Sequence, residues 1–246
     1  MTIVTVPSPT GELLLELTSA PAAITDEVAA WCEEARMPAH LGAPGCERAA
    51  RYQDAEVPVD SLIAYHFTAG DLVRTERERA LRPQPADPRR VAERLFRFER
   101  RAYRLLGAYQ RAESAHAPGA PAAPVLLAVW WEPQPGTEAD LDAWYAEEHI
   151  PRLLTVPGWI RISRYERVSG TGARFLAVHD LQDVAAIASP AHRAALDTPW
   201  RTKVIAQREQ YERRVFLLRR ELTAAPLAVA AHPDAAQAED KQQEKE

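Results

Sequence analysis

The chain has 246 residues, of which 46% are hydrophobic and 26% charged, and its formal net charge at pH 7 is −5. This composition is typical of a soluble globular protein. The acidic balance argues against a nucleic-acid partner, because no basic stripe offsets it. No apolar run approaches the roughly 20 residues of a membrane-spanning helix, so we predict no membrane partner. The chain starts without a secretory signal pattern, and its two cysteines are expected to be free thiols in a cytoplasmic protein.

Two stretches of the chain, residues 13–105 and 126–218, share one pattern at a constant offset of 113 positions. The match needs no gap, and its clearest pairs are Trp31/Trp144, Pro44/Pro157, Gly45/Gly158, Arg51/Arg164, Tyr52/Tyr165 and His66/His179. Self-similarity at a domain-sized period predicts an internal pair of similar folding units.

The boundaries of these units follow from composition. We place the first unit at residues 1–111 and the second at 125–222. Residues 112–124 between them are rich in Ala and Pro and are predicted to be a linker. Residues 223–246 have too few apolar groups to order themselves and are predicted to be a disordered tail.

Taken in chain order, each unit has the signals strand, helix, strand, strand, helix, strand. In the first unit we expect strands at residues 13–18, 46–53, 61–67 and 98–109, a helix at 25–36, and an Arg- and Glu-rich helix after Asp71. In the second unit we expect strands at 125–131, 159–167, 174–181 and 211–220, and helices at 137–149 and 183–196. Thr137 is the expected cap of the first of these helices, and Pro151 is expected to end it.

This order of elements predicts the fold class. A βαββαβ unit places both helices on one face of a four-stranded antiparallel sheet, and the other face then needs cover. We therefore predict an α+β fold in which two tandem ferredoxin-like βαββαβ repeats pack sheet to sheet, as an intrachain pseudo-dimeric α/β barrel.

The second unit resembles a known superfamily. Residues 144–159 follow the pattern W-Y-x-E-E-H-I-P-x-L-L-x-V-P-G-W, and R-x-x-R-Y comes next. This is similar to the helix-to-strand passage of EthD-like members and related polyketide-tailoring proteins in the dimeric α/β-barrel superfamily. The resemblance implies the fold more strongly than a reaction, because the superfamily includes cofactor-independent monooxygenases, polyketide cyclases, lactone isomerases, dehydratases, haem-degrading enzymes and proteins of no known chemistry.

The first helix is where the two units differ in chemistry. Tyr145, Glu148 and His149 of the second unit stand opposite Cys32, Ala35 and Arg36 of the first. Histidine beside a carboxylate and a phenol can transfer protons near neutral pH. We predict His149 as the catalytic acid or base, with Tyr145 and Glu148 orienting it or polarising a substrate oxygen.

Large aromatic side chains gather in the same unit and are expected to bind a flat apolar substrate. The predicted substrate-binding residues are Trp130, Trp131, Trp144, Trp159, Arg161 and His179. Each candidate also has a structural interpretation. The aromatic residues fit a core, His149 fits a helix C-terminus where a cation is favoured, and the matched pair His66 and His179 fits a hydrogen-bonded interface.

The chain lacks the spacing of known metal, phosphate or dinucleotide motifs, so we predict no metal and no cofactor, although a single histidine would suffice for haem. The predicted function is a cofactor-independent lyase, cyclase or isomerase that removes a proton next to a carbonyl of a small aromatic or polyketide-like substrate. One alternative is a cofactor-free monooxygenase of an electron-rich phenol, and another is a non-catalytic ligand- or partner-binding protein. The chain is expected to be a monomer with an internal pair, or a homodimer.

Overall fold

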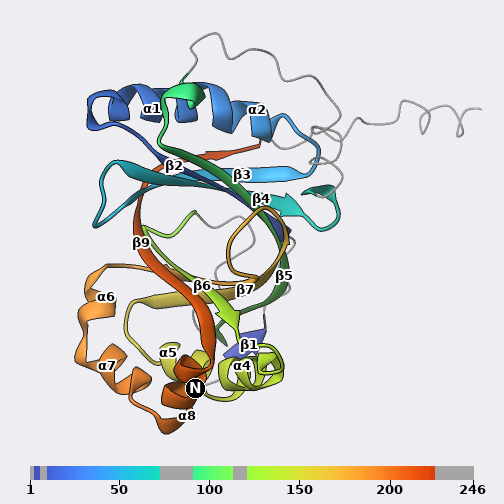
Figure 1. Cartoon of the computed structure of the whole chain (residues 1–246), viewed down its shortest axis with the longest axis vertical. Coiled ribbons are helices and arrows are strands. Elements are labelled where there is room, and N and C mark those ends of the chain that lie inside the picture. The colour runs from blue at the N-terminus through green and yellow to red at the C-terminus, as the bar shows by residue number, and fades with distance from the viewer. Residues whose placement is uncertain (1–2, 6–9, 73–90, 113–120, 225–246) are drawn as a thin grey trace, which may run out of the picture.

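The computed structural model describes residues 3–5, 10–72, 91–112 and 121–224, and its centre is a closed antiparallel β-barrel (Figure 1). The strands are β1 (Ile3–Thr5), β2 (Thr10–Ser19), β3 (Cys46–Asp54), β4 (Asp60–Thr68), β5 (Arg97–Arg111), β6 (Val125–Pro133), β7 (Trp159–Ser169), β8 (Phe175–Leu181) and β9 (Arg208–Thr223). Eight of them pair in the order β5-β2-β4-β3-β9-β6-β8-β7, and a pairing between β5 and β7 closes the ring. Strand β1 lies outside the ring on β5.

The predicted fold class was wrong in its central feature. The structure contains one closed sheet rather than two ferredoxin-like βαββαβ sheets packed face to face. The cause is the length of two strands, because β5 pairs with β2 through residues 97–104 and with β7 through 102–110. Likewise β9 pairs with β6 through residues 208–217 and with β3 through 216–223. Separate sheets would leave four edges of unpaired backbone groups, whereas closure into a barrel leaves none.

Helices cover the outer face of the barrel on two opposite sides, which are at the top and the bottom of Figure 1. We call residues 10–111 the first half and 125–223 the second half. The first half carries η1 (Ala22–Ile24), α1 (Thr25–Trp31), η2 (Cys32–Arg36), α2 (Met37–Leu41) and η3 (Ala92–Arg94). The second half carries α4 (Glu138–Trp144), η5 (Tyr145–His149), α5 (Ile150–Leu153), α6 (Ala185–Ala188), α7 (Pro190–Leu196) and α8 (Pro199–Ala206).

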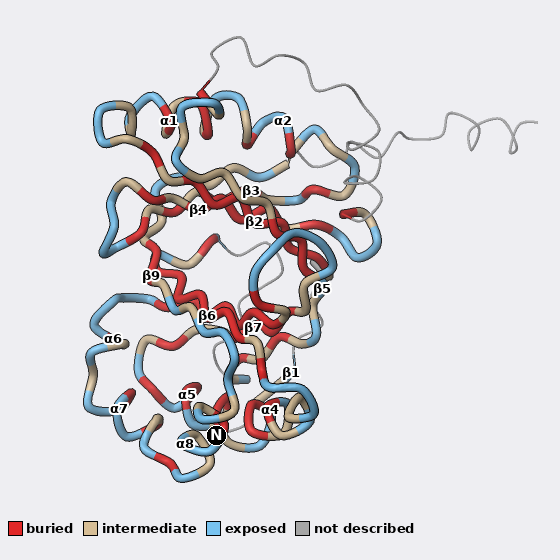
Figure 2. The backbone as a smooth tube through the Cα atoms, viewed as in Figure 1, coloured by how far each residue is buried: buried red, intermediate tan, exposed pale blue. Residues whose placement is uncertain are grey.

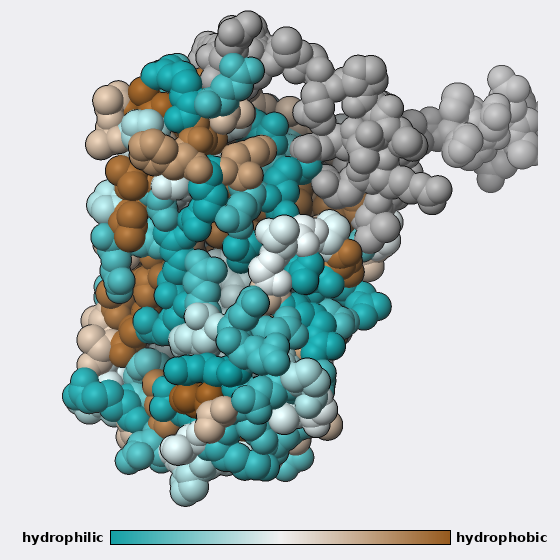
Figure 3. Space-filling view, in the orientation of Figure 1, coloured by the Kyte–Doolittle hydropathy of each residue, from teal (hydrophilic) through white to brown (hydrophobic). Residues whose placement is uncertain are grey.

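Three apolar clusters form the core. One fills the barrel, and one lies between the strands and the helices of each half. Figure 2 shows the buried residues concentrated on the strands and on the inward sides of the helices. The face in Figure 3 is mainly hydrophilic, with hydrophobic residues in separate patches. None of the helices in the described part of the chain is long and apolar enough to cross a membrane.

Several predicted segments lie outside the described residues. They include the helix after Asp71, most of the linker and nearly all of the tail. The helix predicted at residues 183–196 is divided into α6 and α7, and α8, at Pro199–Ala206, was not predicted. Pro190 and Pro199 begin α7 and α8, where a missing amide hydrogen costs nothing, and Ser189 and Thr198 cap these helices with their hydroxyl groups.

Pro151 does not end its helix as predicted. The chain continues from α4 through the π-helical turn η5 into α5. Proline has no amide hydrogen and its ring clashes with the carbonyl four residues back. The wider turn relieves this conflict, since the Ile150 N–H donates to the Tyr145 carbonyl five residues earlier. The first half has the same turn, η2, before Pro38. This spacing brings the rings of Trp144 and His149 into a stack, with centroids 4.1 Å apart.

The two halves are not matched without a gap. Leu13 and Leu126 occupy equivalent positions inside the barrel, yet Leu13 pairs with His66 and Leu126 with Asp180. The paired ends of the β7–β8 hairpin are nine positions apart, and those of the β3–β4 hairpin are eight. A shift of one residue turns every side chain of a strand to the opposite face. His66 therefore lines the barrel interior and His179 lies on the helix side, so they are not equivalent residues.

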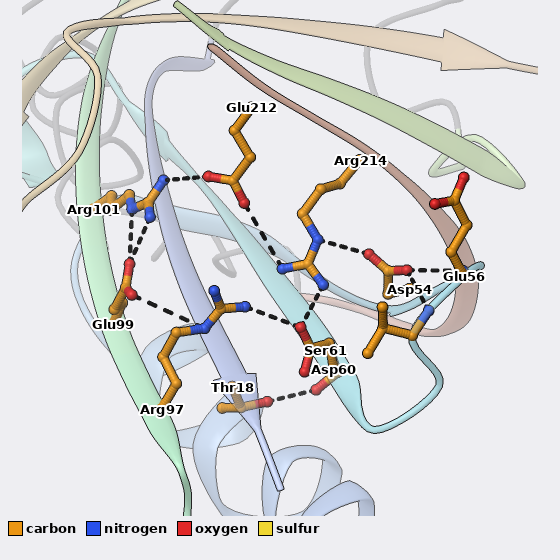
Figure 4. Close-up of polar contacts among 11 residues, drawn as sticks. Thr18, Asp54, Glu56, Asp60, Ser61, Arg97, Glu99, Arg101, Glu212 and Arg214 are labelled. Carbon is orange, nitrogen blue, oxygen red and sulfur yellow. Dashed lines mark hydrogen bonds and ion pairs between the residues drawn. The ribbon is translucent and has the colours of Figure 1, made fainter. Parts of the chain in front are cut away.

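Ion pairs cross the barrel near the β3–β4 hairpin (Figure 4). Arg101 of β5 and Arg214 of β9 lie at matched positions, and both are largely buried. Arg101 binds Glu99 and Glu212, while Arg214 binds Asp54, Asp60 and Glu212. Because the carboxylates come from both halves, the network links the first half to the second.

The substitution Arg214→Met should destabilise the protein strongly. Asp54 and Asp60 are only 5% and 9% exposed, and the change removes the guanidinium that both contact. Among the described residues Asp54 then has no cation, whereas Asp60 keeps Arg97 at 3.1 Å. Leaving a buried carboxylate without its cation costs about 3–5 kcal/mol, which urea denaturation would measure. Arg219→Met on the same strand is the control, because Arg219 is exposed and its one hydrogen bond within the described part of the chain is to the side chain of Gln53, at 2.9 Å. Its cost should stay within about 0.5 kcal/mol, and equal losses in the two variants would contradict the role of the network.

Candidate active site

A cavity of about 100 Å³ lies in the second half, between the outer face of the barrel and the helices. Its lining comes from β6 to β9, from the helix that contains η5, and from α7 and α8. The lining residues are Leu127, Val129, Trp131, Trp144, Tyr145, His149, Leu153, Trp159, His179, His192, Leu196, Arg201, Ile205, Tyr211 and Arg213. Tyr211 and Arg213 are exposed, so the cavity reaches the surface beside β9.

Most of the candidate residues predicted from the sequence line this cavity. They are the predicted catalytic residues His149 and Tyr145 together with Trp131, Trp144, Trp159 and His179. They converge for two reasons. Alternate residues of β6 and β8 face the helices, and the turn η5 directs Tyr145 and His149 toward the sheet. Their roles in binding or catalysis stay predictions.

Three predicted residues lie elsewhere. The indole N–H of Trp130 points into the barrel and donates to the Tyr103 hydroxyl at 3.0 Å. Arg161 also lies inside the barrel, where its Nε is 2.7 Å from Asp180. Glu148 accepts hydrogen bonds from the Trp144 indole at 3.0 Å and from the Thr198 hydroxyl at 2.6 Å. These contacts tie η5 to the start of α8.

His149 is a neutral imidazole in this setting. It is 9% exposed, and burial, with smaller contributions from His179 and Arg201, holds its pKa well below the ordinary value of 6.5. Its ring stacks on Trp144 and meets Tyr145 edge-on at 5.3 Å. Among the described residues neither ring nitrogen has a hydrogen-bond partner. A neutral ring with a free lone pair can accept a proton from a bound molecule.

His179 has its tautomer set by a neighbour. The Trp159 indole N–H donates to Nδ1 of His179 at 3.2 Å, so we assign the ring proton to Nε2. Burial, with a smaller contribution from the charge of Arg213, lowers the pKa of His179 to about 3, which keeps the ring neutral. The centroids of His149 and His179 are 6.3 Å apart. This pair therefore offers one proton acceptor and one hydrogen-bond donor to the same space.

Two further donors face the cavity without a described partner. Burial raises the pKa of Tyr145 to about 12, so its phenol keeps its proton, and the Arg164 guanidinium lies 4.3 Å from its ring centroid. The indole nitrogen of Trp131 is buried and lacks a hydrogen bond within the described part of the chain. An unsatisfied buried donor costs about 1–3 kcal/mol, which a ligand acceptor would recover.

Sequence reasoning missed four polar or aromatic residues of the lining: His192, Arg201, Tyr211 and Arg213. His192 stacks on Trp159 with centroids 5.0 Å apart, and its Nδ1 is 2.7 Å from the Ile187 carbonyl. The sequence held a signal for Arg201, because Thr198-Pro199 marks a helix start. The sequence held no signal for Arg213. Charged residues occupy both faces of this Arg- and Glu-rich strand, so the sequence does not show which of them face the helices.

Two other pockets are present in the described residues. One of about 20 Å³ lies inside the barrel and has room for about one water molecule. The other, of about 140 Å³, lies at the edge of the first half between α1 and the β3–β4 hairpin. It is larger than the cavity around His149, but its lining contains no histidine, cysteine or tyrosine. No group of three His, Cys, Asp or Glu residues in the described ranges is arranged to hold a metal.

Comparisons with known proteins show the fold. The structure is similar to an anthrone oxidase-like protein, with 14% sequence identity, a TM-score of 0.64, and coverage of 94% of this chain and 100% of that one. It is also similar to a putative monooxygenase from Fusobacterium nucleatum (7% identity, TM-score 0.57, 89% and 96% coverage). A putative monooxygenase from Lactobacillus acidophilus matches with 11% identity, a TM-score of 0.54, and 88% and 97% coverage.

Similarity at these levels of sequence identity shows a shared fold and assigns neither a superfamily nor a reaction to this chain. No protein-family model matches the sequence, and no curated protein is similar to it. The narrower resemblance to EthD-like members is therefore still a prediction.

The buried histidines should make the protein less stable in mild acid. The unfolded chain binds a proton to His179 below about pH 6.5, whereas the folded chain does so only near pH 3. Within that window stability falls as pH falls, by about 1.4 kcal/mol per pH unit for each such histidine. His179→Gln should reduce the slope by about that amount between pH 6.5 and 5, measured by urea denaturation. An unchanged slope would show that His179 is not held neutral in the folded protein.

Proposed function

We propose that this protein is a small-molecule enzyme in which His149 removes a proton from a carbon next to a carbonyl group. The observation that supports this function best is a buried neutral imidazole beside donors without a described partner, all facing one cavity. General bases and oxyanion donors need this combination. A histidine that only packed against Trp144 would not require a cavity beside it.

The proton transfer can be followed through these side chains. The C–H bond breaks, its proton goes to a ring nitrogen of His149, and its electron pair delocalises onto the carbonyl oxygen. The Tyr145 hydroxyl, which keeps its proton, then donates a hydrogen bond to the enolate oxygen. The protonated His149 can return its proton to another carbon, which gives isomerisation, or to a departing hydroxyl group, which gives dehydration. Attack of the enolate on a second carbonyl gives cyclisation.

A second candidate is oxygenation of the same carbanion. In that reaction a methylene group and dioxygen give a carbonyl group and water, and the substrate supplies the electrons that reduce oxygen. The names of the similar structures, an anthrone oxidase-like protein and two putative monooxygenases, favour this branch. The acid–base step at His149 is common to both candidates, so they differ only in what happens to the carbanion.

The size of the cavity limits the substrate. An apolar cavity of about 150 Å³ holds one benzene molecule, and this cavity measures about 100 Å³. At most about one ring fits inside, so any larger part of a substrate must lie at the mouth beside Tyr211 and Arg213.

Deuterium exchange tests the proton abstraction without knowledge of the product. Phenylacetone, phenylpyruvate and anthrone each carry an exchangeable C–H next to a carbonyl, and NMR in deuterated buffer follows their exchange. His149→Gln should lower the protein-catalysed exchange rate by about 10²–10⁴. Glu148→Gln is the control, because Glu148 lies outside the cavity and glutamine keeps an acceptor for Trp144 and Thr198. Equal exchange by wild-type protein and His149→Gln would reject the catalytic role.

The pH dependence of this exchange gives an independent prediction. Because burial lowers the pKa of His149 well below 6.5, the base stays unprotonated as the pH falls through that value. The exchange rate constant should therefore be unchanged between about pH 8 and 6.5 and should decrease only in more acidic buffer. A decrease centred on pH 6.5 would indicate a solvent-exposed imidazole instead.

An oxygen electrode separates the two candidate functions. Oxygenation predicts oxygen uptake in step with substrate loss and no product under nitrogen. Isomerisation, dehydration or cyclisation would proceed at the same rate with or without oxygen.

A further inference from the structure

The first half has a position equivalent to the cavity of the second half, but in the first half side chains fill it. Strand registers match Glu16 of β2 with Val129 of β6, since Glu16 pairs with Arg100 and Val129 pairs with Arg213. The two arginines are therefore equivalent. By the same registers Tyr65 matches His179, and the π-helical turns match Arg36 with His149.

Glu16 places a carboxylate at the centre of that filled position. It is fully buried, and its Oε1 lies 2.9 Å from Nε of Arg100. Its Oε2 accepts hydrogen bonds from the Tyr65 hydroxyl at 3.1 Å and from Nε of Arg36 at 3.2 Å. Burial alone would raise the pKa of Glu16, but Arg36, His40 and Arg100 hold it below its ordinary value. The first half thus binds its own carboxylate with an arginine on β5 and a donor on β4.

The second half keeps the donors and lacks the carboxylate. Val129 replaces the glutamate, and the cavity lies where its carboxylate would be. Arg213 is equivalent to Arg100. His179 is equivalent to Tyr65, so its Nε2–H is the donor that corresponds to the Tyr65 hydroxyl. Within the described part of the chain, Arg213 has no ion pair and this N–H has no acceptor.

The charge of the cavity lining also favours a bound carboxylate. Its lining includes Arg201 and Arg213 but no Asp or Glu, and neither guanidinium has a described carboxylate partner. Burial is the main cause of the lowered pKa values of His149, His179 and His192, and the charges of Arg201 and Arg213 contribute in the same direction. The unpartnered indole N–H of Trp131 adds a further donor. Such a site favours an anion with two acceptor oxygens, because guanidinium binds carboxylates in a two-pronged geometry.

We propose that the cavity binds a small carboxylic acid, whose carboxylate lies where that of Glu16 lies in the first half and contacts Arg213 and the Nε2–H of His179. The apolar body of the acid, of at most about one ring, lies against Trp131, Trp144 and Leu127. This inference deepens the proposed function by assigning the substrate class, and it rests on that function only in taking this cavity as the substrate site.

The test compares acids with neutral amides of the same shape. Benzoate and isobutyrate are titrated into the full-length protein beside benzamide and isobutyramide, by calorimetry near pH 7.5. At least one acid should bind about 10- to 100-fold more tightly than its amide, as expected for hydrogen bonds to a charged group. Arg213→Gln should abolish this preference without changing the urea midpoint, because Arg213 is exposed.

Arg219→Gln is the matched control, an exposed arginine on the same strand that lies outside the cavity lining. It should keep the preference for the acid. The proposal is overturned if neither acid binds more tightly than its amide, or if the preference survives Arg213→Gln. Benzoate and benzamide carry no C–H next to the carbonyl carbon, and the C–H beside the carboxylate of isobutyrate or the amide of isobutyramide is far less acidic than that of a ketone, so the binding of these probes does not depend on catalysis. His149-dependent exchange of phenylacetone without acid binding would overturn this inference alone.

A second variant uses the equivalence of the two halves. Val129→Glu places a carboxylate in the cavity, as Glu16 does in the first half, and Val129→Gln places a neutral group of the same size. Both should block benzoate, but only the glutamate should pair with Arg213, so Val129→Glu should have the higher urea midpoint at pH 7.5. A lower midpoint for the glutamate than for the glutamine would contradict the match between Val129 and Glu16.

Discussion

The double pairing of β5 and β9 is the constraint on which the rest of this structure depends. Each strand is long enough to pair first with its own half and then with the other, so the sheet closes without an edge. Closure gives every strand one face toward the barrel and one toward the helices. The barrel interior is filled by side chains and by the ion pairs of Arg101 and Arg214. Among the described residues, the pockets of about 100 and 140 Å³ lie on the outer, helix-covered faces, whereas the pocket inside the barrel measures about 20 Å³.

On those faces the two halves share a frame and differ in content. Each has a π-helical turn before a proline, a tryptophan one residue before that turn, and an arginine on the last strand. The first half buries the carboxylate of Glu16 between the guanidinium groups of Arg36 and Arg100, beside His40, and a buried charge of this kind is stable only because it has oppositely charged partners. The second half replaces the carboxylate by Val129 and the guanidinium of Arg36 by the imidazole of His149. It thereby exchanges a closed ionic cluster for a cavity with polar walls.

Much of this site was predictable from local sequence. The contrast between Tyr145-x-x-Glu148-His149 and its first-half counterpart indicated the half and the helix that border the cavity of about 100 Å³, and four of the predicted aromatic and histidine wall residues line it. The failures have specific causes. Trp130 and Arg161 point into the barrel, because residue 130 and its neighbour Trp131 face opposite sides of one strand. Glu148 instead accepts a hydrogen bond from Thr198, the residue that caps α8, and this helix was not predicted from the sequence.

The sequence by itself determined the strands, the helix that carries His149, and the position of the contrast between halves, because these depend on hydrophobic period and on residues close together in the chain. Only the tertiary structure decided that β5 and β9 join two sheets into one barrel, because strand pairing between residues more than 50 positions apart leaves no local signal. It also decided that His179 faces the cavity while His66 does not. One additional residue in a hairpin sets that difference, and its effect appears only once the strands are in register.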